Sequence, residues 1–270
     1  MLIAQITDTH ITSPGTLLLG IVDTASALER AVAALNRLNP SPDAVVLTGD
    51  LVETGATEEY AHLRALLAPL RMPLFAIPGN HDAREPMRQA FIGDGYLPRQ
   101  EFLNYVIDEY SLRIVALDTL VPGEGGGALC SERLRWVDRI LSGAPERPTL
   151  MLMHHPPFLT GIRRMDQARL SGSAAFAEVI RGYPQVERIL CGHLHRPIES
   201  RFAGTIAGTA PSTAHQIVLD LRPEARLSFA FEPPGYQLHY WREGIGLVTH
   251  TAAIGDWPGP YFYSKKPATS

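Results

Sequence analysis

Seven residues with side chains that can bind metal ions follow short apolar runs along the chain. They comprise two carboxylates, one amide and four imidazoles, namely Asp8, His10, Asp50, Asn80, His154, His193 and His195. Mixed nitrogen and oxygen donors suit borderline transition metals such as Zn²⁺, Mn²⁺ and Fe, whereas an all-oxygen set would indicate Mg²⁺ or Ca²⁺. Seven donors are too many for one tetrahedral ion but suit two ions that share one carboxylate. The sequence therefore predicts a pair of transition-metal ions.

Asp50 is the candidate for the shared ligand, because it follows the central apolar strand expected at residues 44–48. An ionised carboxylate at the end of a strand that is buried on both faces needs a positive partner. We expect one ion to be bound by Asp8, His10, Asp50 and His195. We expect the other ion to be bound by Asp50, Asn80, His154 and His193.

Five expected strands position these ligands, and the ligands follow the strand ends. The apolar runs cover residues 2–7, 44–48, 74–78, 149–153 and 186–191. In open α/β sheets, the ligand-binding crevice lies outside the carboxyl ends of the strands. Metal ligands at five successive strand ends therefore indicate one shared site.

The segments between these runs predict an α/β fold. Helices are expected near residues 24–38, 58–67 and 173–181, with Thr57 as the N-cap of the second, and Ser131 is expected to cap a further helix. Residues 104–107 and 112–117 have the pattern of an antiparallel hairpin. The order β-α-β-α-β at the start of the chain favours a parallel sheet with helical crossovers.

Composition and charge limit the partners that we expect. The chain of 270 residues is 45% hydrophobic and 19% charged, which fits a soluble globular protein. Its formal net charge of −4 gives no basic footprint for a nucleic acid polymer. No apolar run approaches the roughly 20 residues of a membrane span. Since no export segment precedes the first strand, we expect no membrane partner and a cytoplasmic location.

The chain has only two cysteines, Cys130 and Cys191. A single disulfide between them is possible, but a secreted scaffold would normally carry more cysteines. Cys191 ends an apolar run and is therefore expected to be a small buried residue rather than half of a bridge.

Five motifs taken together resemble the calcineurin-like metallophosphoesterases. They are Asp8-Thr9-His10, Gly49-Asp50, Gly79-Asn80-His81-Asp82, His154 after its strand, and Gly192-His193-Leu194-His195. The similarity spans residues 2 to 195 and is greatest to the bacterial cyclic-nucleotide and glycerophosphodiester phosphodiesterase branch. That branch is indicated by His154-His155-Pro156-Pro157, Met165-Asp166 and Ser212-Thr213-Ala214-His215-Gln216. The resemblance implies a four-layer α/β/β/α sandwich of two mixed β-sheets flanked by helices, with a dinuclear metal site.

The part after residue 200 predicts short strands beyond the catalytic core. These are expected at residues 205–207, 215–221, 227–231, 236–241 and 247–252. We therefore divide the chain into a metallophosphoesterase core, residues 1–200, and a β-rich part, residues 201–270, that completes the second sheet within one structural domain. An aromatic tail from Trp257 to Tyr263 needs a surface to cover it and predicts a homo-oligomer, dimeric or higher.

The resemblance implies a phosphodiesterase that acts on small phosphodiesters, either cyclic nucleotides such as cAMP or glycerophosphodiesters. Two bound ions would lower the pKa of a bridging water, and the resulting hydroxide would attack phosphorus. His81 would donate a proton to the leaving group or stabilise its charge, with Asp82 fixing the His81 tautomer. Asn80, His81 and His215 are the candidate substrate-binding residues, and we expect the pocket walls to come from residues 10–20, the loop after His155 and the segment around His215.

Two other functions are compatible with the same motifs. One is a non-catalytic metal-binding scaffold, and the other is a phosphomonoesterase, nuclease or protein phosphatase. The complete ligand set with His81 favours an enzyme, while the acidic charge and the β-rich C-terminal part favour a small substrate. Each histidine taken alone could be structural, and we expect His155 to point away from the metals. The physiological substrate and the choice among Fe, Mn and Zn stay open.

Overall fold

The structure, a computed structural model, describes residues 1–99 and 101–263. Its elements in chain order are β1 (Leu2–Ile6), α1 (Thr24–Asn36), β2 (Ala44–Thr48), α2 (Thr57–Leu67), β3 (Leu74–Ile77), α3 (Arg84–Ala90), the 3₁₀ turn η1 (Ile92–Asp94), β4 (Tyr105–Ile107), β5 (Arg113–Ala116), α4 (Ser131–Ser142), β6 (Thr149–Leu152), α5 (Arg163–Gln167), α6 (Ser173–Arg181), β7 (Val186–Cys191), β8 (Ile198–Phe202), β9 (Thr205–Thr209), β10 (Gln216–Ile217), β11 (Phe229–Ala230), β12 (Gly235–Arg242) and β13 (Gly246–Ala253).

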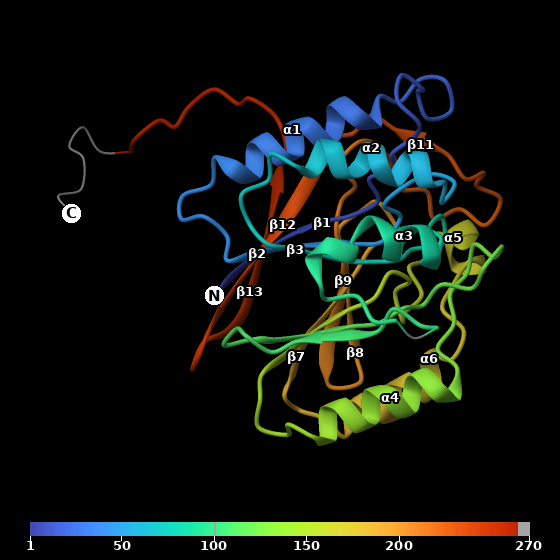
Figure 1. Cartoon of the computed structure of the whole chain (residues 1–270), viewed down its shortest axis with the longest axis vertical. Helices are drawn as coiled ribbons and strands as arrows, with labels where there is room; N and C mark the ends of the chain where they lie inside the picture. The colour runs from blue at the N-terminus through green and yellow to red at the C-terminus, as the bar shows by residue number, and fades with distance from the viewer. Residues whose placement is uncertain (100, 264–270) are drawn as a thin grey trace.

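Two large mixed sheets form the centre of the fold. The five-stranded sheet has the order β13-β12-β1-β2-β3, and the six-stranded sheet has the order β4-β5-β6-β7-β9-β8. Strands β1, β2 and β3 run parallel, and so do β5, β6, β7 and β9. Helices α1, α2 and α3 lie over the five-stranded sheet, whereas α4 and α6 lie over the six-stranded sheet (Figure 1). The predicted four-layer α/β/β/α sandwich is confirmed.

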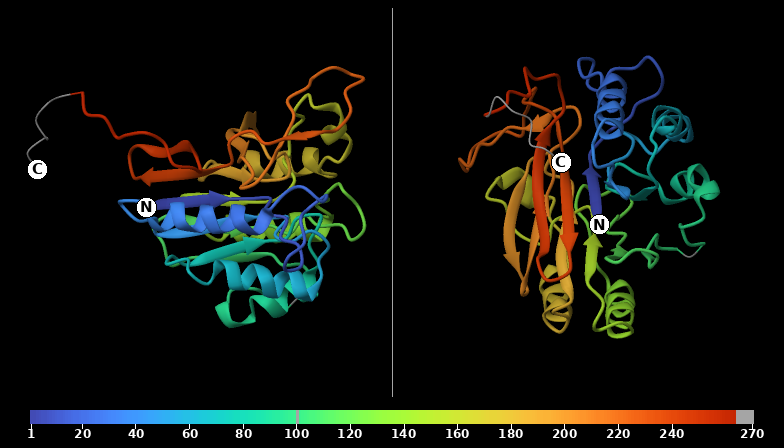
Figure 2. Two further views of the ribbon diagram at one scale, coloured as in Figure 1. Left: turned by 90° about the horizontal axis from the view of Figure 1, so that it is seen from above. Right: turned by 90° about the vertical axis from the view of Figure 1, so that its left-hand side faces the viewer.

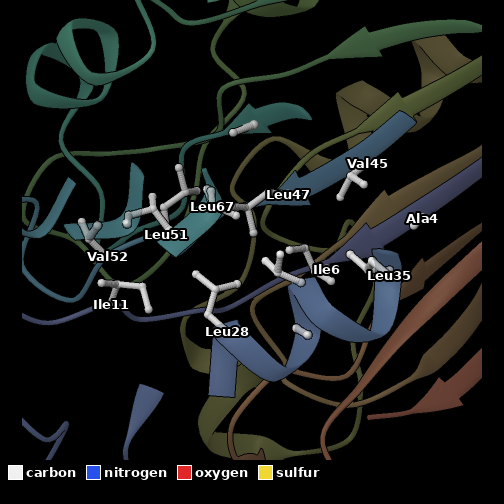
Figure 3. Close-up of a cluster of buried hydrophobic side chains, with 14 of the residues drawn as sticks. Ala4, Ile6, Ile11, Leu28, Leu35, Val45, Leu47, Leu51, Val52 and Leu67 are labelled. Carbon is white, nitrogen blue, oxygen red and sulfur yellow. The ribbon is translucent and has the colours of Figure 1, made fainter. Parts of the chain in front are cut away.

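Strand β2 shows why the centre is apolar on both faces. Val45 and Leu47 pack with the helices above the five-stranded sheet, and Figure 3 shows Leu47 near Leu28 of α1 and Leu67 of α2. The alternate residues of β2, Ala44 and Val46, pack instead between the two sheets. Successive side chains of a strand point to opposite faces, so a continuous apolar run suits a strand that is covered on both sides.

The second apolar layer lies between the sheets, and the third lies under the six-stranded sheet. Ile114 of β5 and Leu152 of β6 contact the five-stranded sheet across the interface. On the opposite face, Met151 of β6 packs with Phe176 and Ile180 of α6. The two sheets and their helices are thus joined by continuous burial, which fixes the strand ends relative to one another.

The starts of α2 and α4 differ from the sequence expectations by one residue. The N-caps are Ala56 and Cys130, and neither gives a side-chain cap bond, so Thr57 and Ser131 are the first helical residues instead. At α2 the Glu59 carboxylate accepts hydrogen bonds from the backbone N–H groups of Thr54 and Ala56. A buried glutamate therefore satisfies amide donors at this helix start without a capping hydroxyl.

The C-terminal strands are shared between the sheets, which corrects the expectation that they complete the second sheet. Only β8 and β9 join the six-stranded sheet, whereas β12 pairs with β1 and β13 with β12. The physical reason is the free edge of β1, whose N–H and C=O groups need a partner strand. The strands expected at 215–221 and 227–231 shrink to β10 and β11, which form a separate pair. Helices α3 and α5 and strand β8 were not predicted.

Both cysteines are free thiols, Cys130 exposed and Cys191 buried, so the expectation for Cys191 is confirmed. Among the helices in the described part of the chain, none is both long and apolar enough to cross a membrane.

Candidate metal centre

The carboxyl ends of β1, β2, β3, β6 and β7 bring the seven predicted ligands together. The segments after β1 and β2 stay paired beyond the strands, because Asp8 N donates to Gly49 O at 3.1 Å and His10 N donates to Asp50 O at 3.0 Å. The next parallel strand, β3, leads to Asn80, while β6 and β7 lead to the ligands of the second sheet. All seven residues belong to one cluster of side chains, Asp8, His10, Asp50, Asn80, His154, His193 and His195.

The four residues expected around one ion approach one another closely. The Nε2 atoms of His10 and His195 lie 3.1 Å apart. His195 Nε2 is 3.5 Å from Asp8 Oδ1, and His10 Nε2 is 3.6 Å from Asp50 Oδ2. Asp8 and Asp50 are fully or almost fully buried, as are both imidazoles. This half of the cluster presents only nitrogen and oxygen donors to its centre.

The other half is arranged around His154. Its Nε2 atom lies 3.1 Å from Asn80 Oδ1 and 3.3 Å from Asp50 Oδ2. The ring of His193 packs edge-on against the ring of His154, with 5.1 Å between centroids. Asp50 Oδ2 is thus near an imidazole of each half, His10 at 3.6 Å and His154 at 3.3 Å. That position is the one required of a ligand shared by two ions.

Hydrogen bonds behind the cluster fix which nitrogen of each imidazole faces its centre. The Nδ1–H groups of His10, His154 and His195 donate to the Glu53 carboxylate, Thr48 O and His215 O, respectively. His193 uses its Nε2–H instead, which donates to Ala168 O at 3.1 Å. Since each ring donates through one nitrogen, the other is left to bind a cation.

The charges of the cluster call for positive charge at its centre. Burial raises the pKa of Asp50, but His154 and His10 outweigh it and hold that pKa well below the usual range of a carboxyl. Burial lowers the pKa of His154, yet Asp50 and Asp8 raise it to about 9. Burial likewise opposes protonation of His10, but Glu53 and Asp50 raise its pKa. The carboxylates thus favour positive charge beside His10 and His154, and the N/O donor set of the cluster fits Zn, Mn or Fe.

The backbone at the ligands is strained. Five of the seven ligands have positive φ angles: Asp8 at 51°, His10 at 43°, Asp50 at 50°, His193 at 73° and His195 at 51°. A residue other than glycine rarely adopts this left-handed region, and such conformations concentrate at functional sites. The strain allows each segment to turn its side chain back toward the cluster immediately after the strand.

Glycines before three ligands allow the segments to approach closely. A Cβ atom on Gly79 would lie 2.2 Å from Asp50 Oδ1, and one on Gly49 would lie 2.3 Å from His154 Nδ1. A Cβ atom on Gly192 would lie 2.2 Å from Thr7 Oγ1. None of the three distances is compatible with a side chain, so these motif positions require glycine for packing.

His81 lies beside the metal cluster, but the predicted role of Asp82 is wrong. The His81 ring packs edge-on against His10 at 4.7 Å, and its Nδ1–H donates to Glu53 O at 2.8 Å. Asp82 instead accepts hydrogen bonds from Leu51 N, Gly79 N and the Tyr60 hydroxyl. A residue adjacent in sequence thus faces the opposite side of the turn, and Asp82 holds the loops after β2 and β3 together.

His155 does not point away from the cluster as expected. Its ring centroid is 4.6 Å from that of His193 and 4.9 Å from that of His154. Its nitrogens are occupied, because Nδ1 accepts from the Thr119 hydroxyl and Nε2 donates to Gly125 O. His155 therefore packs behind two ligands as a buried neutral imidazole, and burial holds its pKa well below the usual range.

A pocket of about 650 Å³ opens over the cluster. Its polar floor includes Asn80, His81 and His215, the three candidate substrate-binding residues. Its walls include residues from all three expected segments, namely Leu18, Leu19, Arg164, Met165, Ala168 and Ile217. Strand β11 adds Phe229, whose ring packs edge-on against His215 at 5.1 Å. The pocket thus joins a charged floor to mostly apolar walls.

Glu53 is the site residue that the sequence reasoning missed. Its carboxylate contacts His10, and its carbonyl contacts His81. The sequence pattern that could have indicated Glu53 is its position three residues after Asp50, in the segment that follows the end of β2.

Comparisons with known proteins show the family of the chain. Residues 1–197 match the model of the calcineurin-like phosphoesterases. A probable glycerophosphodiester phosphodiesterase of Arcobacter nitrofigilis is 40% identical over 268 residues, which cover 98% of either chain. A 3′,5′-cyclic adenosine monophosphate phosphodiesterase of Pseudomonas aeruginosa is 34% identical over 217 residues, 80% of this chain and 77% of that protein.

Solved structures support the fold. A dimetal phosphatase from Danio rerio superposes with a TM-score of 0.65 at 15% sequence identity, over 94% of this chain and 99% of its own. At this identity the similarity concerns the arrangement of the elements alone.

Proposed function

The chain belongs to the calcineurin-like phosphoesterase family and is a metal-dependent phosphodiesterase for small phosphodiesters, and we propose that glycerophosphodiesters are its main substrates. The observation that carries the activity is the convergence of the seven donors, with Asp50 Oδ2 3.6 Å from His10 and 3.3 Å from His154. The substrate class rests on the sequence identity, which is 40% to the probable glycerophosphodiester phosphodiesterase and 34% to the cyclic adenosine monophosphate phosphodiesterase.

The residues present would hold two ions drawn from Fe, Mn and Zn. Asp8, His10 and His195 would bind one, Asn80, His154 and His193 would bind the other, and Asp50 would bind both. When bound, such a pair neutralises phosphoryl oxygens and lowers the pKa of a water so that it can attack phosphorus. The chain's own contribution is to fix the donors before the substrate arrives, through the strained backbone and the hydrogen bonds behind each imidazole.

With a proton on both ring nitrogens, His81 would give its Nε2 proton to the departing alkoxide. Its Nδ1–H is held by Glu53 O at 2.8 Å, so Nε2 is the nitrogen available to the pocket that the ring lines. Asn80 and His215 would contact the substrate on the same floor. The His215 carbonyl also accepts from His195 Nδ1 at 3.1 Å, so His215 combines contact with the pocket and support of a ligand.

Cyclic nucleotides are the second candidate substrates, and one part of the pocket wall supports them. Phe229, Leu227 and Ile217 form an apolar surface against which a nucleobase would pack. Arg164 supplies a cation on the wall, which would contact an additional charged group on the alcohol.

The test is a comparison of kcat/KM for a glycerophosphodiester, cAMP and a phosphomonoester. The protein is loaded in turn with Zn²⁺, Mn²⁺ and Fe²⁺, and metal content is measured in parallel. The proposal expects the glycerophosphodiester to be the best substrate, followed by cAMP. A higher kcat/KM for cAMP would replace the first candidate by the second, and activity on the monoester alone would overturn both.

We also expect a homo-oligomer, which the exposed tail supports. Residues 255–263 extend away from the body of the protein after β13 (Figure 2). Trp257 is 63% exposed, and Tyr261 and Phe262 are each 81% exposed. Aromatic side chains at this exposure favour a partner surface. The cytoplasmic location stays a prediction and is consistent with the two free thiols.

A further inference from the structure

We propose that Glu53 is a positioning residue that orients the ligand His10 with its carboxylate and the proton donor His81 with its carbonyl. Glu53 Oε2 accepts the Nδ1–H of His10 at 2.8 Å, and Glu53 O accepts the Nδ1–H of His81 at 2.8 Å. One residue therefore sets the direction of two rings that pack edge-on at 4.7 Å. The assignment rests on the proposed function, since it concerns the same ions and the same leaving group.

The backbone holds Glu53 in register with His10. Ile11 N donates to Leu51 O at 3.1 Å, and Glu53 N donates to Ile11 O at 3.1 Å, so the pairing of β1 with β2 continues as a bridge between Ile11 and Val52. This pairing places the Glu53 carboxylate beside the His10 ring. The position of the Glu53 carboxylate is therefore set by the backbone pairing.

The Glu53 carboxylate determines which nitrogen of His10 is left to bind a metal ion. With Nδ1–H donated to Glu53, the opposite nitrogen of His10 faces His195 Nε2 at 3.1 Å and Asp50 Oδ2 at 3.6 Å. Without that acceptor, the imidazole can adopt the other tautomer or rotate, and either change removes its lone pair from the first ion. A carboxylate–histidine–metal arrangement also makes the ligand more basic.

The effect of Glu53 is expected to be confined to one of the two ions. The second half of the centre is held by Thr48 O behind His154 and by Ala168 O behind His193, neither of which depends on the Glu53 side chain. Removal of the carboxylate should therefore weaken one ion and spare the other. A general loss of folding would weaken both.

A different interpretation of the same residues is a third cation site. The imidazoles of His10 and His81 and the Glu53 carboxylate place one ligand atom each within 4.8 Å of one another. The hydrogen-bond geometry argues against it, because both Nδ1 atoms already donate to Glu53. Binding of three equivalents of metal by the wild type would indicate that third site.

The experiment is a Zn²⁺ titration of the metal-free full chain against a competing chelator, for wild type, Glu53→Ala and Glu53→Gln. Glu58→Gln is the matched control, because Glu58 is an exposed glutamate in the first turn of α2. We expect two equivalents in every protein, with the affinity of one ion lowered about 10- to 100-fold in Glu53→Ala. Glu53→Gln should restore most of that loss, because an amide oxygen can still accept from His10 Nδ1.

A second readout reports the ring directly. In ¹⁵N spectra of the Zn²⁺-loaded wild type, His10 should carry its proton on Nδ1, and in Glu53→Ala that proton should exchange faster with water because it has lost its acceptor. Unchanged affinities in Glu53→Ala, equal weakening of both ions, or a third equivalent in wild type would each overturn the assignment. Because binding is measured without substrate, a failure of the phosphodiesterase assay on wild type would count against the proposed function alone.

Discussion

The Nε2 atoms of His10 and His195 lie 3.1 Å apart, and neither ring can easily relieve the approach. His10 Nδ1 donates to Glu53, and His195 Nδ1 donates to His215 O. Two nitrogens that face each other in this way need a positive charge next to them, either a proton or a metal ion. Burial opposes protonation of His10, but Glu53 and Asp50 raise its pKa. The close approach of the two rings is therefore consistent with the proposed cation site.

Metal removal should lower the stability of the folded protein. The donors converge only in the folded state, so a bound ion stabilises the native state by mass action, about 4 kcal/mol for each ion at free metal 1,000-fold above Kd. Thermal melts with excess EDTA and with graded free Zn²⁺ check this. A melting temperature that does not depend on metal concentration would contradict the site.

His81→Ala should keep both ions and slow turnover. The loss should be about 10²- to 10⁴-fold for an alkyl phosphodiester, whose leaving group needs a proton. It should be much smaller for bis(p-nitrophenyl) phosphate, whose leaving group departs as an anion. The measurement is kcat for both substrates with metal content determined in the same preparation. Equal losses on the two substrates would exclude His81 as the proton donor.

Gly79→Ala should damage the metal centre although it adds a single methyl group. The new Cβ would lie 2.2 Å from Asp50 Oδ1, so Asp50 or the loop after β3 must move. Overpacking of this kind costs about 1–3 kcal/mol. Gly93→Ala is the matched control, because its Cβ would meet nothing within 4 Å. The free energy of unfolding in urea and the metal content should both fall for Gly79→Ala. Neither should change for Gly93→Ala.

The position of the ligands at the ends of strands was predictable, because it depends on local sequence patterns. Apolar runs that end in Asp, Asn or His mark strand ends, and the carboxyl ends of parallel strands meet at one edge. Asp50 and His154 could therefore be placed together across about 100 residues of chain. The positive φ angles at Asp8 and His193 were not predictable, since they arise where tertiary contacts impose a turn on each segment.

The roles of Asp82 and Glu53 were not predicted correctly, because they depend on the direction in which each side chain points. Asp82 follows His81 directly, but the turn aims its carboxylate at Leu51 N and Gly79 N. Glu53 lacks a strand-end position, and only the pairing of the segments after β1 and β2 brings it to His10. The placement of β12 against β1 is a contact across more than 200 residues, with Leu2 opposite Tyr240, and no local pattern encodes it.

His239 should make stability depend on pH independently of the metals. It is fully buried, with Nδ1 2.9 Å from Thr249 Oγ1 and Nε2 3.0 Å from Gln5 Oε1. Burial, and to a lesser extent Arg188, lowers its pKa to about 3, whereas the unfolded chain protonates near the ordinary value of 6.5. The unfolded state thus binds a proton that the folded state does not, so stability falls as the pH decreases from about 6.5 toward 3.

The corresponding measurement is urea unfolding of metal-free wild type and His239→Gln. Each pH unit in this range should cost the wild type up to about 1.4 kcal/mol through His239, so the wild type should lose about 1.6 kcal/mol more than the variant between pH 6.5 and 5. Parallel curves for the two proteins would show that His239 does not titrate in this way.

The most direct test of the metal centre is the metal content of Asp50→Ala. Asp50 Oδ2 lies near His10 at 3.6 Å and near His154 at 3.3 Å, so its removal takes a ligand from both ions at once. Elemental analysis after dialysis against a weak chelator, with folding verified by circular dichroism, should find two equivalents of metal in wild type and almost none in Asp50→Ala. A folded Asp50→Ala that retains two equivalents would contradict the shared carboxylate and the dinuclear centre built around it.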